Sequence, residues 1–361
     1  MMTIATLNTW GIPYVKDRPQ RMNALAAELA TGQYDIIGLQ EIWDEKDFDT
    51  LRQSAESNGL CYTHHFKSGY VGSGLGVFSR YPIIELDFHR FRLTGTAETF
   101  YHGDYMAGKG IGLARIKTPD GILDFYITHL IAQYHPDAFD EYPAHRAAQM
   151  FEATRFINTR PDNPAILVGD FNVRPDQLGY RLITTLSGMQ DAYGALHPDA
   201  AGYTHSNENV YVHEPQSQRI DYIMHRNGIT PQSIQLAFEA IPNASIPYSD
   251  HYGLIMTCTF HPQPPDRLND PLTVLQELYE VMQAGIIDGK QRQEYRNTRF
   301  QIGILAFLAV NLLPRRVKLI LRSITIIYIV TQRALMDYFI RDEVNDMKQV
   351  LAEVETLVHS S

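Results

Sequence analysis

Short apolar segments, most of them followed within two positions by a polar residue, fill the first 262 residues and constrain the fold more than any other feature. They have the length and the Val/Ile/Leu content of buried strands, and turns rich in Gly, Pro and Asp separate them. The segments predicted to be strands are Thr3–Leu7, Ile36–Leu39, Gly74–Phe78, Gly112–Ile116, Leu123–Thr128, Ile166–Val168, Ile220–Met224 and Leu254–Phe260. Helices are predicted at Arg18–Ala30 and Pro143–Asn158. Many strands with few helices predict an α+β fold in which two packed sheets have helices on the outside.

The chain changes character after residue 262. The Pro-rich stretch His261–Asp266 predicts a stiff linker, so we expect residues 1–262 to form one domain and residues 263–361 to form a helical appendage. In the appendage, apolar residues from Leu275 to Ile286 mark an amphipathic helix, and those from Met336 to Val358 recur at near-heptad spacing.

Two apolar runs, Phe300–Leu313 and Leu319–Val330, lie between these helices and are joined by Pro314-Arg315-Arg316. As a helix, the first run would span roughly 21 Å, which is short of the ~30 Å hydrocarbon core of a bilayer. The pattern therefore favours a shallow or re-entrant helical hairpin with its arginines at the lipid headgroups. A small helical bundle docked on the body is the alternative.

The net charge of −10 is unevenly distributed. Residues 290–322 hold eight basic residues and one acidic residue, a composition that suits an anionic membrane surface. The remainder is strongly acidic, so no nucleic acid partner is expected.

The few cysteines and the start of the chain bear on its location. Cys61 and Cys258 are the only cysteines, which favours a reducing compartment over a structural disulfide. The first residues, Met1–Leu7, have the pattern of a strand rather than of a signal peptide. These features predict an intracellular protein that is associated with a membrane at its cytoplasmic face.

The motif Gly169-Asp170-Phe171-Asn172 directly follows the apolar run Ala165–Val168. Asp170 and Asn172 are two positions apart on an extended segment, so their side chains point to the same side. Such a pair suits hydrolysis of a phosphodiester, in which a carboxylate holds the attacking water and an amide donates to a phosphoryl oxygen. An ordinary Asx turn is the alternative.

Further polar residues at strand ends complete the set. Glu41 follows a buried strand, where a carboxylate is costly unless it meets a cation, and this favours a metal ligand. His251 follows Asp250 after a polar turn, and the apolar-flanked Asp221 suits the orientation of an imidazole. His129 ends another predicted strand. Each residue alone also fits a purely structural role, so the ordered set carries the prediction.

With these residues placed, the chain resembles the endonuclease/exonuclease/phosphatase superfamily over residues 3 to 260. The matching motifs, in order, are Leu7–Gly11, Gln40-Glu41, Thr128–Leu130, Gly169–Asn172, Arg219–Tyr222 and Ser249–His251. Four further stretches resemble the neutral, magnesium-dependent sphingomyelinases of that superfamily: Asn8–Tyr14, Phe66–Leu75, His102–Gly110 and Ala144–Gln149. The resemblance implies a DNase-like, four-layer α/β/β/α sandwich of two mixed sheets.

The resemblance also implies a reaction and a role for each site residue. The implied reaction is Mg²⁺-dependent hydrolysis of sphingomyelin to ceramide and phosphocholine at a membrane surface, with Mn²⁺ as a substitute ion. The roles implied by position are metal binding by Glu41, Asn8 and Asp250, water activation by Asp170, phosphoryl contacts by Asn172 and His251, orientation of His251 by Asp221, a place facing the leaving group for His129, and a mobile loop over the site that carries Asp104 and Lys109.

Several other functions compete with this prediction. A lipid phosphodiesterase acting on lyso-phosphatidylcholine, platelet-activating-factor-type lipids or inositol sphingolipids would use the same site. A nuclease or an inositol polyphosphate phosphatase of the same superfamily fits less well, because the body is acidic and no Lys/Arg cluster lies near the motifs. A non-catalytic membrane adaptor is the alternative of a different class, and such proteins usually lose metal or base residues that are all present here.

Overall fold

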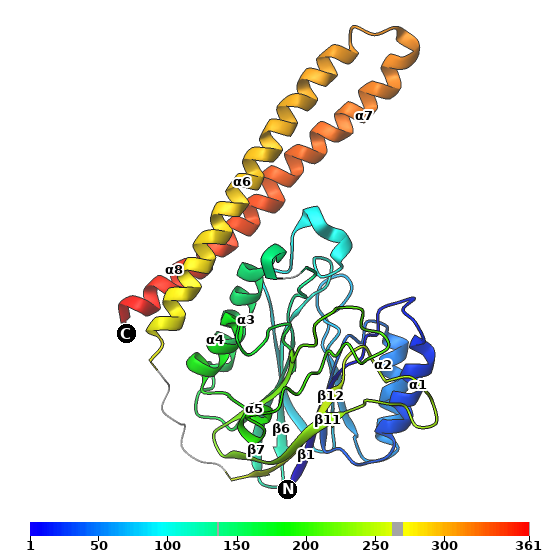
Figure 1. Ribbon diagram of the computed structural model, residues 1–361, viewed down its shortest axis with the longest axis vertical. Helices are drawn as coiled ribbons and strands as arrows, with labels where there is room; N and C mark the ends of the chain where they lie inside the picture. Colours follow the sequence, from blue (N-terminus) through cyan, green and yellow to red (C-terminus); the bar gives the residue numbers. More distant parts are fainter. Residues whose placement is uncertain (136, 262–269, 361) are drawn as a thin grey trace.

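Two six-stranded mixed sheets pack face to face in the computed structural model, which describes residues 1–135, 137–261 and 270–360 (Figure 1). The strand order is β11-β12-β1-β2-β4-β3 in the first sheet and β5-β6-β7-β8-β10-β9 in the second. The pairs β1–β2 and β7–β8 are parallel, and the other neighbours are antiparallel. The strands are β1 (Met2–Asn8), β2 (Ile36–Gln40), β3 (Tyr62–His65), β4 (Gly76–Ser79), β5 (Ile83–Arg90), β6 (Gly110–Thr118), β7 (Gly121–His129), β8 (Ala165–Asp170), β9 (Gln190–Asp191), β10 (Asp221–Arg226), β11 (Ile229–Ala237) and β12 (Gly253–Phe260).

Helices cover the outer face of each sheet. The body helices are α1 (Arg18–Leu29), α2 (Glu45–Glu56), α3 (Pro143–Ile157), α4 (Leu178–Ser187) and α5 (Ala192–Leu196), with short helical turns η1 (Ala97–His102) and η2 (Asp137–Phe139). Ile4 and Val168 belong to a buried cluster between the two sheets. Leu25 of α1 belongs to a second cluster outside the first sheet, and Phe151 of α3 to a third outside the second sheet. These three apolar layers confirm the predicted α/β/β/α sandwich.

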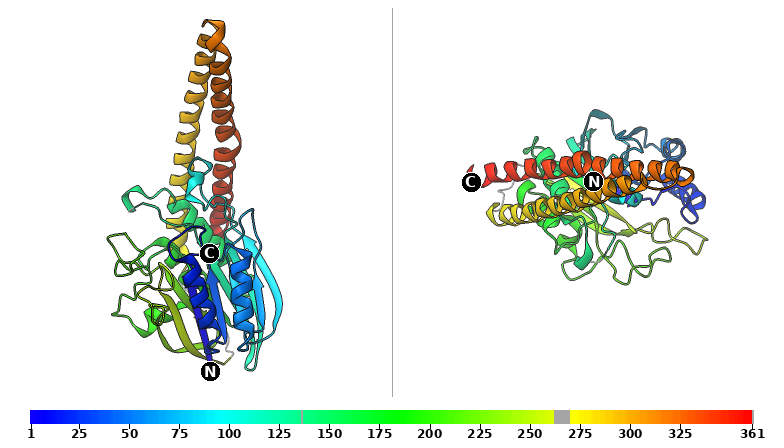
Figure 2. Two further views of the ribbon diagram at one scale, coloured as in Figure 1. Left: turned by 90° about the vertical axis from the view of Figure 1, so that its right-hand side faces the viewer. Right: turned by 90° about the horizontal axis from the view of Figure 1, so that it is seen from above.

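The C-terminal helices form a long antiparallel stalk that projects from one end of the sandwich (Figure 2). It consists of α6 (Leu272–Val310), α7 (Arg315–Ala334), the π-helical turn η3 (Leu335–Ile340) and α8 (Arg341–Ser360). The amphipathic segment and the first apolar run, predicted as separate helices, are one continuous helix of 39 residues, because the polar residues between them also favour helix.

The base of the stalk belongs to the core of the body. Leu278 and Met282 of α6 and Val350 of α8 are buried in the same apolar cluster as Phe151 of α3. Hydrophobic packing therefore continues across the domain boundary that the sequence predicts. The boundary itself, at residues 262–269, lies outside the described residues, so the division into two domains stays a prediction.

We expect Leu278→Ala to lower the free energy of unfolding of the body by about 2–5 kcal/mol, because the side chain is fully buried and its loss leaves a cavity. Urea unfolding of the detergent-solubilised protein, followed at the tryptophans of the body, measures this change. The matched variant Leu305→Ala lies on the exposed distal stalk and should leave the midpoint unchanged. Equal midpoints for both variants would contradict a shared core.

The distal stalk presents apolar side chains to its surroundings. Leu305, Leu312, Ile320 and Ile327 are all exposed there. In the described part of the chain, one helix, Val317–His359, is long and apolar enough to cross a membrane, and only 6% of its most apolar window is buried. Exposed apolar surface on this scale is typical of a membrane- or protein-binding segment.

Candidate active site

Strand register brings three of the predicted site residues into one row. His129, the last residue of β7, pairs with Asp170 at the end of β8, and Asp170 pairs with Asp221 at the start of β10. The glycine before Asp170 is required by this packing. Gly169 has φ +148°, and a Cβ atom there would lie 2.0 Å from the carbonyl oxygen of Thr128.

The first sheet contributes Asn8 and Glu41 at the same edge. Asn8 Nδ2 donates to Glu41 Oε1 at 3.1 Å and to Asp170 Oδ2 at 3.0 Å, so one amide joins carboxylates of both sheets. Three non-glycine residues beside this contact, Trp10, Glu41 and Asn172, have positive φ values of 47°, 60° and 49°. Strained backbone of this kind gathers at functional sites, where surrounding contacts hold it in place.

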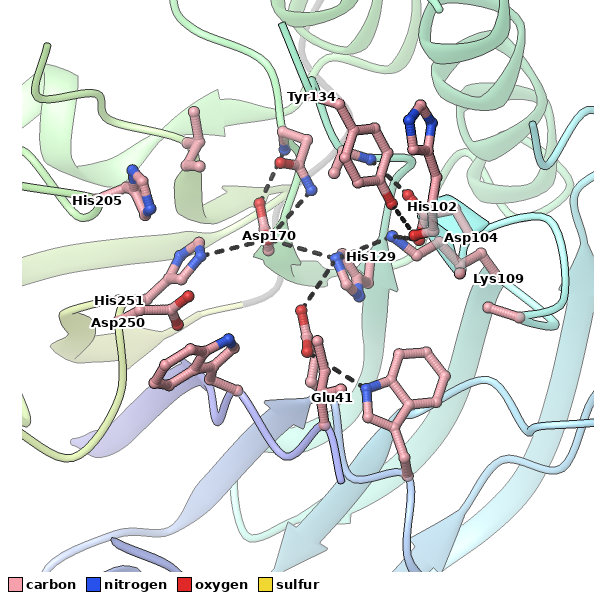
Figure 3. Close-up of a pocket in the computed structure, with 18 of the residues that line it drawn as sticks. Glu41, His102, Asp104, Lys109, His129, Tyr134, Asp170, His205, Asp250 and His251 are labelled. Carbon is pink, nitrogen blue, oxygen red and sulfur yellow. Dashed lines mark hydrogen bonds and ion pairs between the residues drawn. The ribbon is translucent and has the colours of Figure 1, made fainter. Parts of the chain in front are cut away.

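Asp170 lies at the centre of a hydrogen-bond network (Figure 3). It accepts from the backbone N–H of Asn172 at 2.9 Å and from the Asn172 amide at 3.2 Å. His251 Nε2 lies 4.0 Å from Asp170 Oδ2, while His251 Nδ1 contacts Asp221 Oδ2 at 2.8 Å. Burial, and then the Asp221 carboxylate, raise the pKa of Asp170 to about 7. The carboxyl group can therefore exchange a proton near neutral pH.

The two imidazoles at this edge differ in charge. Burial alone would lower the pKa of His251, but the carboxylates of Asp221 and Asp170 outweigh it and raise that pKa well above its usual value. Burial and the ammonium group of Lys109 hold the pKa of His129 well below its usual value. His251 is thus a cation and His129 is neutral at physiological pH.

Lys109 and Asp104 form a buried ion pair beside His129. The Lys109 Nζ atom lies 2.6 Å from Asp104 Oδ1, 3.1 Å from His129 Nε2 and 2.8 Å from the Leu130 carbonyl oxygen. The backbone N–H of Ala132 donates to Asp104 Oδ2 at 2.9 Å. The predicted pair is therefore in the site, with the lysine fixed by three acceptors.

The carboxylates outnumber the cations here. Glu41, Asp104, Asp170, Asp221 and Asp250 are five carboxyl groups, and their buried positive neighbours among the described residues are Lys109, protonated His251 and, beside Asp250, Arg21. Burial, and then the Asp250 carboxylate, raise the pKa of Glu41. This surplus of oxygen donors fits a hard divalent cation, which would restore charge balance.

Asn8 is oriented differently from what a metal ligand needs. Its Oδ1 accepts from the backbone N–H of Trp10 at 3.0 Å, and its NH₂ group faces Glu41 and Asp170. A metal would bind the oxygen. Of the three residues implied as ligands, Glu41 and Asp250 present carboxylates to the cavity, and Asn8 holds one of them.

The site opens into a cavity of ≈ 780 Å³. Eight of the ten predicted site residues line it, whereas Asn8 and Asp221 lie beneath its surface and contact lining residues. The lining also includes residues to which the sequence analysis assigns no role: Trp10, Trp43, His102, Tyr134 and His205. Four of them lie on loops and His102 ends the short turn η1, so none belongs to a periodic pattern. Only contacts reveal them, such as Trp43 Nε1 donating to Glu41 Oε2 at 3.3 Å.

Solved structures with the same fold include a protein bound to DNA and a bacterial toxin. The D. rerio TDP2 complexed with a single-strand DNA product is 20% identical and has a TM-score of 0.59 over 72% of this chain and 98% of that one. The beta toxin of Staphylococcus aureus with bound magnesium ions is 14% identical and has a TM-score of 0.51 over 71% of this chain and 98% of that one. At these identities the likeness shows the fold alone.

Relatives found by sequence comparison have a higher sequence identity to this chain than these two solved structures do. Sphingomyelin phosphodiesterase 2 of Homo sapiens is 36% identical over 282 residues, which are 74% of this chain and 66% of that protein. Inositol phosphosphingolipids phospholipase C of Schizosaccharomyces pombe is 29% identical over 296 residues, or 73% of this chain and 69% of that protein. The chain thus spans just under two thirds of the human relative's length. The endonuclease/exonuclease/phosphatase family model matches residues 5–251, so the chain belongs to that family.

Proposed function

We propose that this chain hydrolyses the headgroup phosphodiester of a sphingolipid in a phospholipase C-type reaction, with sphingomyelin cleaved to ceramide and phosphocholine. The observation that carries the chemistry is the place of Asp170, a buried carboxyl group that accepts hydrogen bonds from Asn8 and Asn172 and lies 4.0 Å from His251 in one cavity. The sphingolipid class rests on the names of the relatives, which include a sphingomyelin phosphodiesterase.

Residues of the chain supply most parts of the reaction. A water molecule held by Asp170 attacks phosphorus, and the water proton passes to the Asp170 carboxylate. The bond from phosphorus to the ceramide oxygen breaks as that oxygen takes a proton from a second water, so ceramide leaves as the alcohol and Asp170 then returns its proton to solvent. Protonated His251, fixed by Asp221, donates to a phosphoryl oxygen. Asn172 positions Asp170 through two hydrogen bonds. Lys109 places positive charge beside His129, on the side proposed for the leaving oxygen.

Glu41 and Asp250 would hold the divalent cation, which we propose to be Mg²⁺ with Mn²⁺ as a substitute. When bound, the cation neutralises phosphate charge. Both carboxylates face the cavity, which supports this assignment.

Release of phosphocholine from sphingomyelin in mixed micelles tests the proposal. Turnover should need a divalent cation and stop with EDTA. Inositol phosphosphingolipid is the second candidate substrate, because a relative is named for it. Lyso-phosphatidylcholine and single-stranded DNA complete the comparison. Preferential cleavage of any of these compounds would leave the assignment of the catalytic residues intact but would show that sphingomyelin is not the preferred substrate. If none of the compounds is cleaved, the result would favour the non-catalytic adaptor.

We expect Asp221→Asn to shift the pH dependence of the rate. The Asp221 carboxylate raises the pKa of His251, so its removal lowers that pKa, and the imidazole loses its proton at a lower pH. The alkaline limb of the kcat/KM profile should then move to lower pH, with a loss on the order of 100-fold at pH 8. An unchanged alkaline limb would mean that His251 does not act as a cation.

We also propose that the stalk associates with the membrane, through its exposed apolar residues and the basic segment 290–322, at the cytoplasmic face. Figure 1 supports a site that faces the bilayer. The start of β1 lies at the end of the sandwich remote from the stalk tip, so the far end of β1, at Asn8, lies on the stalk side.

A further inference from the structure

Exposed aromatic side chains surround the mouth of the cavity. Tyr14, Tyr70, Phe100 and Tyr101 have relative exposures of 103%, 95%, 63% and 71%. Tyr14, Tyr70 and Tyr101 are each the direct neighbour of a residue that lines the cavity, namely Pro13, Val71 and His102. Large rings that gather on three loops around one opening form a surface suited to binding, whereas single exposed apolar residues need no explanation. We call Tyr14, Tyr70, Phe100 and Tyr101 the aromatic rim.

Two of the three loops are joined to each other. Gly69 and Ala107 form an isolated β-bridge, and the backbone N–H of Gly108 donates to the carbonyl oxygen of Gly72 at 2.9 Å. The loop with Tyr70 and the segment that follows Phe100 and Tyr101 therefore move together. These two parts of the rim are thus connected next to the Asp104–Lys109 pair.

The loop of Phe100 and Tyr101 is also bound to the stalk. Glu98, in η1, accepts from Arg292 Nη1 at 2.5 Å and forms an ion pair with Arg296 Nη2 at 2.9 Å. The rings of Tyr105 and Phe339 meet with their centroids 6.3 Å apart. Figures 1 and 2 both show this loop, in cyan, beside the stalk.

The attachment point fixes the height of the rim relative to the apolar part of the stalk. The first apolar run begins at Phe300, four residues after Arg296, which is about 6 Å along the helix axis. A bilayer that surrounds the stalk from Phe300 onward therefore comes within roughly one helical turn of η1. The exposed rings of Phe100 and Tyr101 bridge a distance of that size.

From this geometry we infer that the aromatic rim is a second membrane-contact surface, which inserts into the headgroup region of the bilayer and seats the cavity mouth on it. Aromatic rings, tyrosine above all, favour this region because one end is apolar and the other accepts hydration. The inference rests on the proposed function, since a lipid substrate must enter the cavity from the bilayer. It adds the surface that brings the headgroup to Asp170.

A depth measurement tests the contact without using activity. The full chain with Cys61→Ser and Phe100→Cys, labelled with an environment-sensitive fluorophore and reconstituted in phosphatidylcholine–sphingomyelin vesicles, should be quenched by lipids brominated on their acyl chains. Ile122→Cys is the matched control, because it is exposed near the turn between β6 and β7, at the other end of β7 from His129. Equal quenching at the two positions would overturn the inference. So would an absence of quenching at position 100, the result expected if a protein partner or a second copy of the chain covers the rim.

A kinetic test uses the double variant Phe100→Ser/Tyr101→Ser. Turnover of sphingomyelin in vesicles should fall about tenfold, since two rings lose their interfacial contact, while turnover of a short-chain phosphocholine lipid below its micellar concentration stays within about twofold. The control Ile84→Ser/Ile122→Ser should change neither rate. Equal loss on both substrates would overturn the inference. If the wild-type chain cleaves neither substrate, the proposed function is refuted. The quenching experiment alone then tests whether the aromatic rim contacts the membrane.

Discussion

Replacement of Asp170 by asparagine will lower the rate of phosphodiester hydrolysis by a factor on the order of 10³ or more, measured as phosphocholine release at saturating substrate and metal. Asparagine preserves the size of the side chain but cannot take a proton from water, and general bases contribute roughly 10²–10⁴-fold. The control is Asp124→Asn, a buried carboxyl group near the other end of β7, which should keep near wild-type activity. Comparable losses in both variants would indicate damage to the fold.

The effect of Asp170→Asn on the stability of the fold should be much smaller than its effect on the rate, and it should depend on pH. The pKa of Asp170 is about 7 in the folded chain, against an ordinary value of 3.8, so protonated Asp170 stabilises the native state. That contribution is fully present below about pH 4 and is lost as the pH rises to about 7. Above pH 7, Asp170→Asn removes a buried charge at the cost of one acceptor, and we expect a change in Tm of only a few degrees.

The second large effect is expected for Glu41→Gln. The loss of a charged oxygen ligand should raise the Kd for Mg²⁺ on the order of 100-fold and make turnover strongly dependent on added metal. The chain has only two tryptophans, and both Trp10 and Trp43 line the cavity. Intrinsic fluorescence in a Mg²⁺ titration therefore reports on the site without any substrate.

Glu45→Gln is the matched control for this experiment. Glu45 also lines the cavity but is largely exposed, so its charge is solvated and its removal should leave the Kd for Mg²⁺ within about twofold. If the Glu41→Gln variant bound Mg²⁺ with the Kd of the wild type, Glu41 would not be a metal ligand and the metal site would lie elsewhere. Asp250 and the neighbouring His205, whose donor atoms lie within 4.8 Å of one another, would then be the alternative ligands.

The sequence predicts the interior of each sheet but not its edges. All eight predicted strands are found, and the four that were missed, β3, β5, β9 and β11, are the outermost strands of the two sheets. Edge strands carry polar residues because they are only partly covered. β5 alternates charged residues such as Glu85 with apolar ones, and β11 contains Pro231 next to a register shift, which only an edge tolerates.

The helices show the same limit. The sequence pattern does not predict α2 (Glu45–Glu56), because this helix is mostly polar and only Phe48, Leu51 and Ala55 are buried. Its signals were local, an Asp44 N-cap that accepts from the backbone N–H of Lys46 and acidic residues in the first turn. Periodicity finds helices with a wide apolar face, and this helix has a narrow one.

The site could be predicted where its residues follow inner strands. Asp170, His129 and Glu41 are of this kind, since register alone gathers strand ends at one edge. No sequence pattern gives His205 a role, yet its ring lies 5.1 Å from that of His251. His102 stacks on Tyr134 at 4.0 Å between ring centroids. These contacts depend on how loops fold over the sheet edge, which no local pattern encodes.

The stalk has a consequence for how reaction rates depend on concentration. An enzyme held at a bilayer by α6 and α7 meets its substrate in two dimensions, at an effective concentration set by the mole fraction of that lipid in the membrane. Dilution of the vesicles in buffer would leave the rate per enzyme unchanged, whereas dilution of the substrate among other lipids would lower it. Phosphocholine would leave into water and ceramide would stay in the bilayer, so turnover itself would change the surface on which the enzyme works.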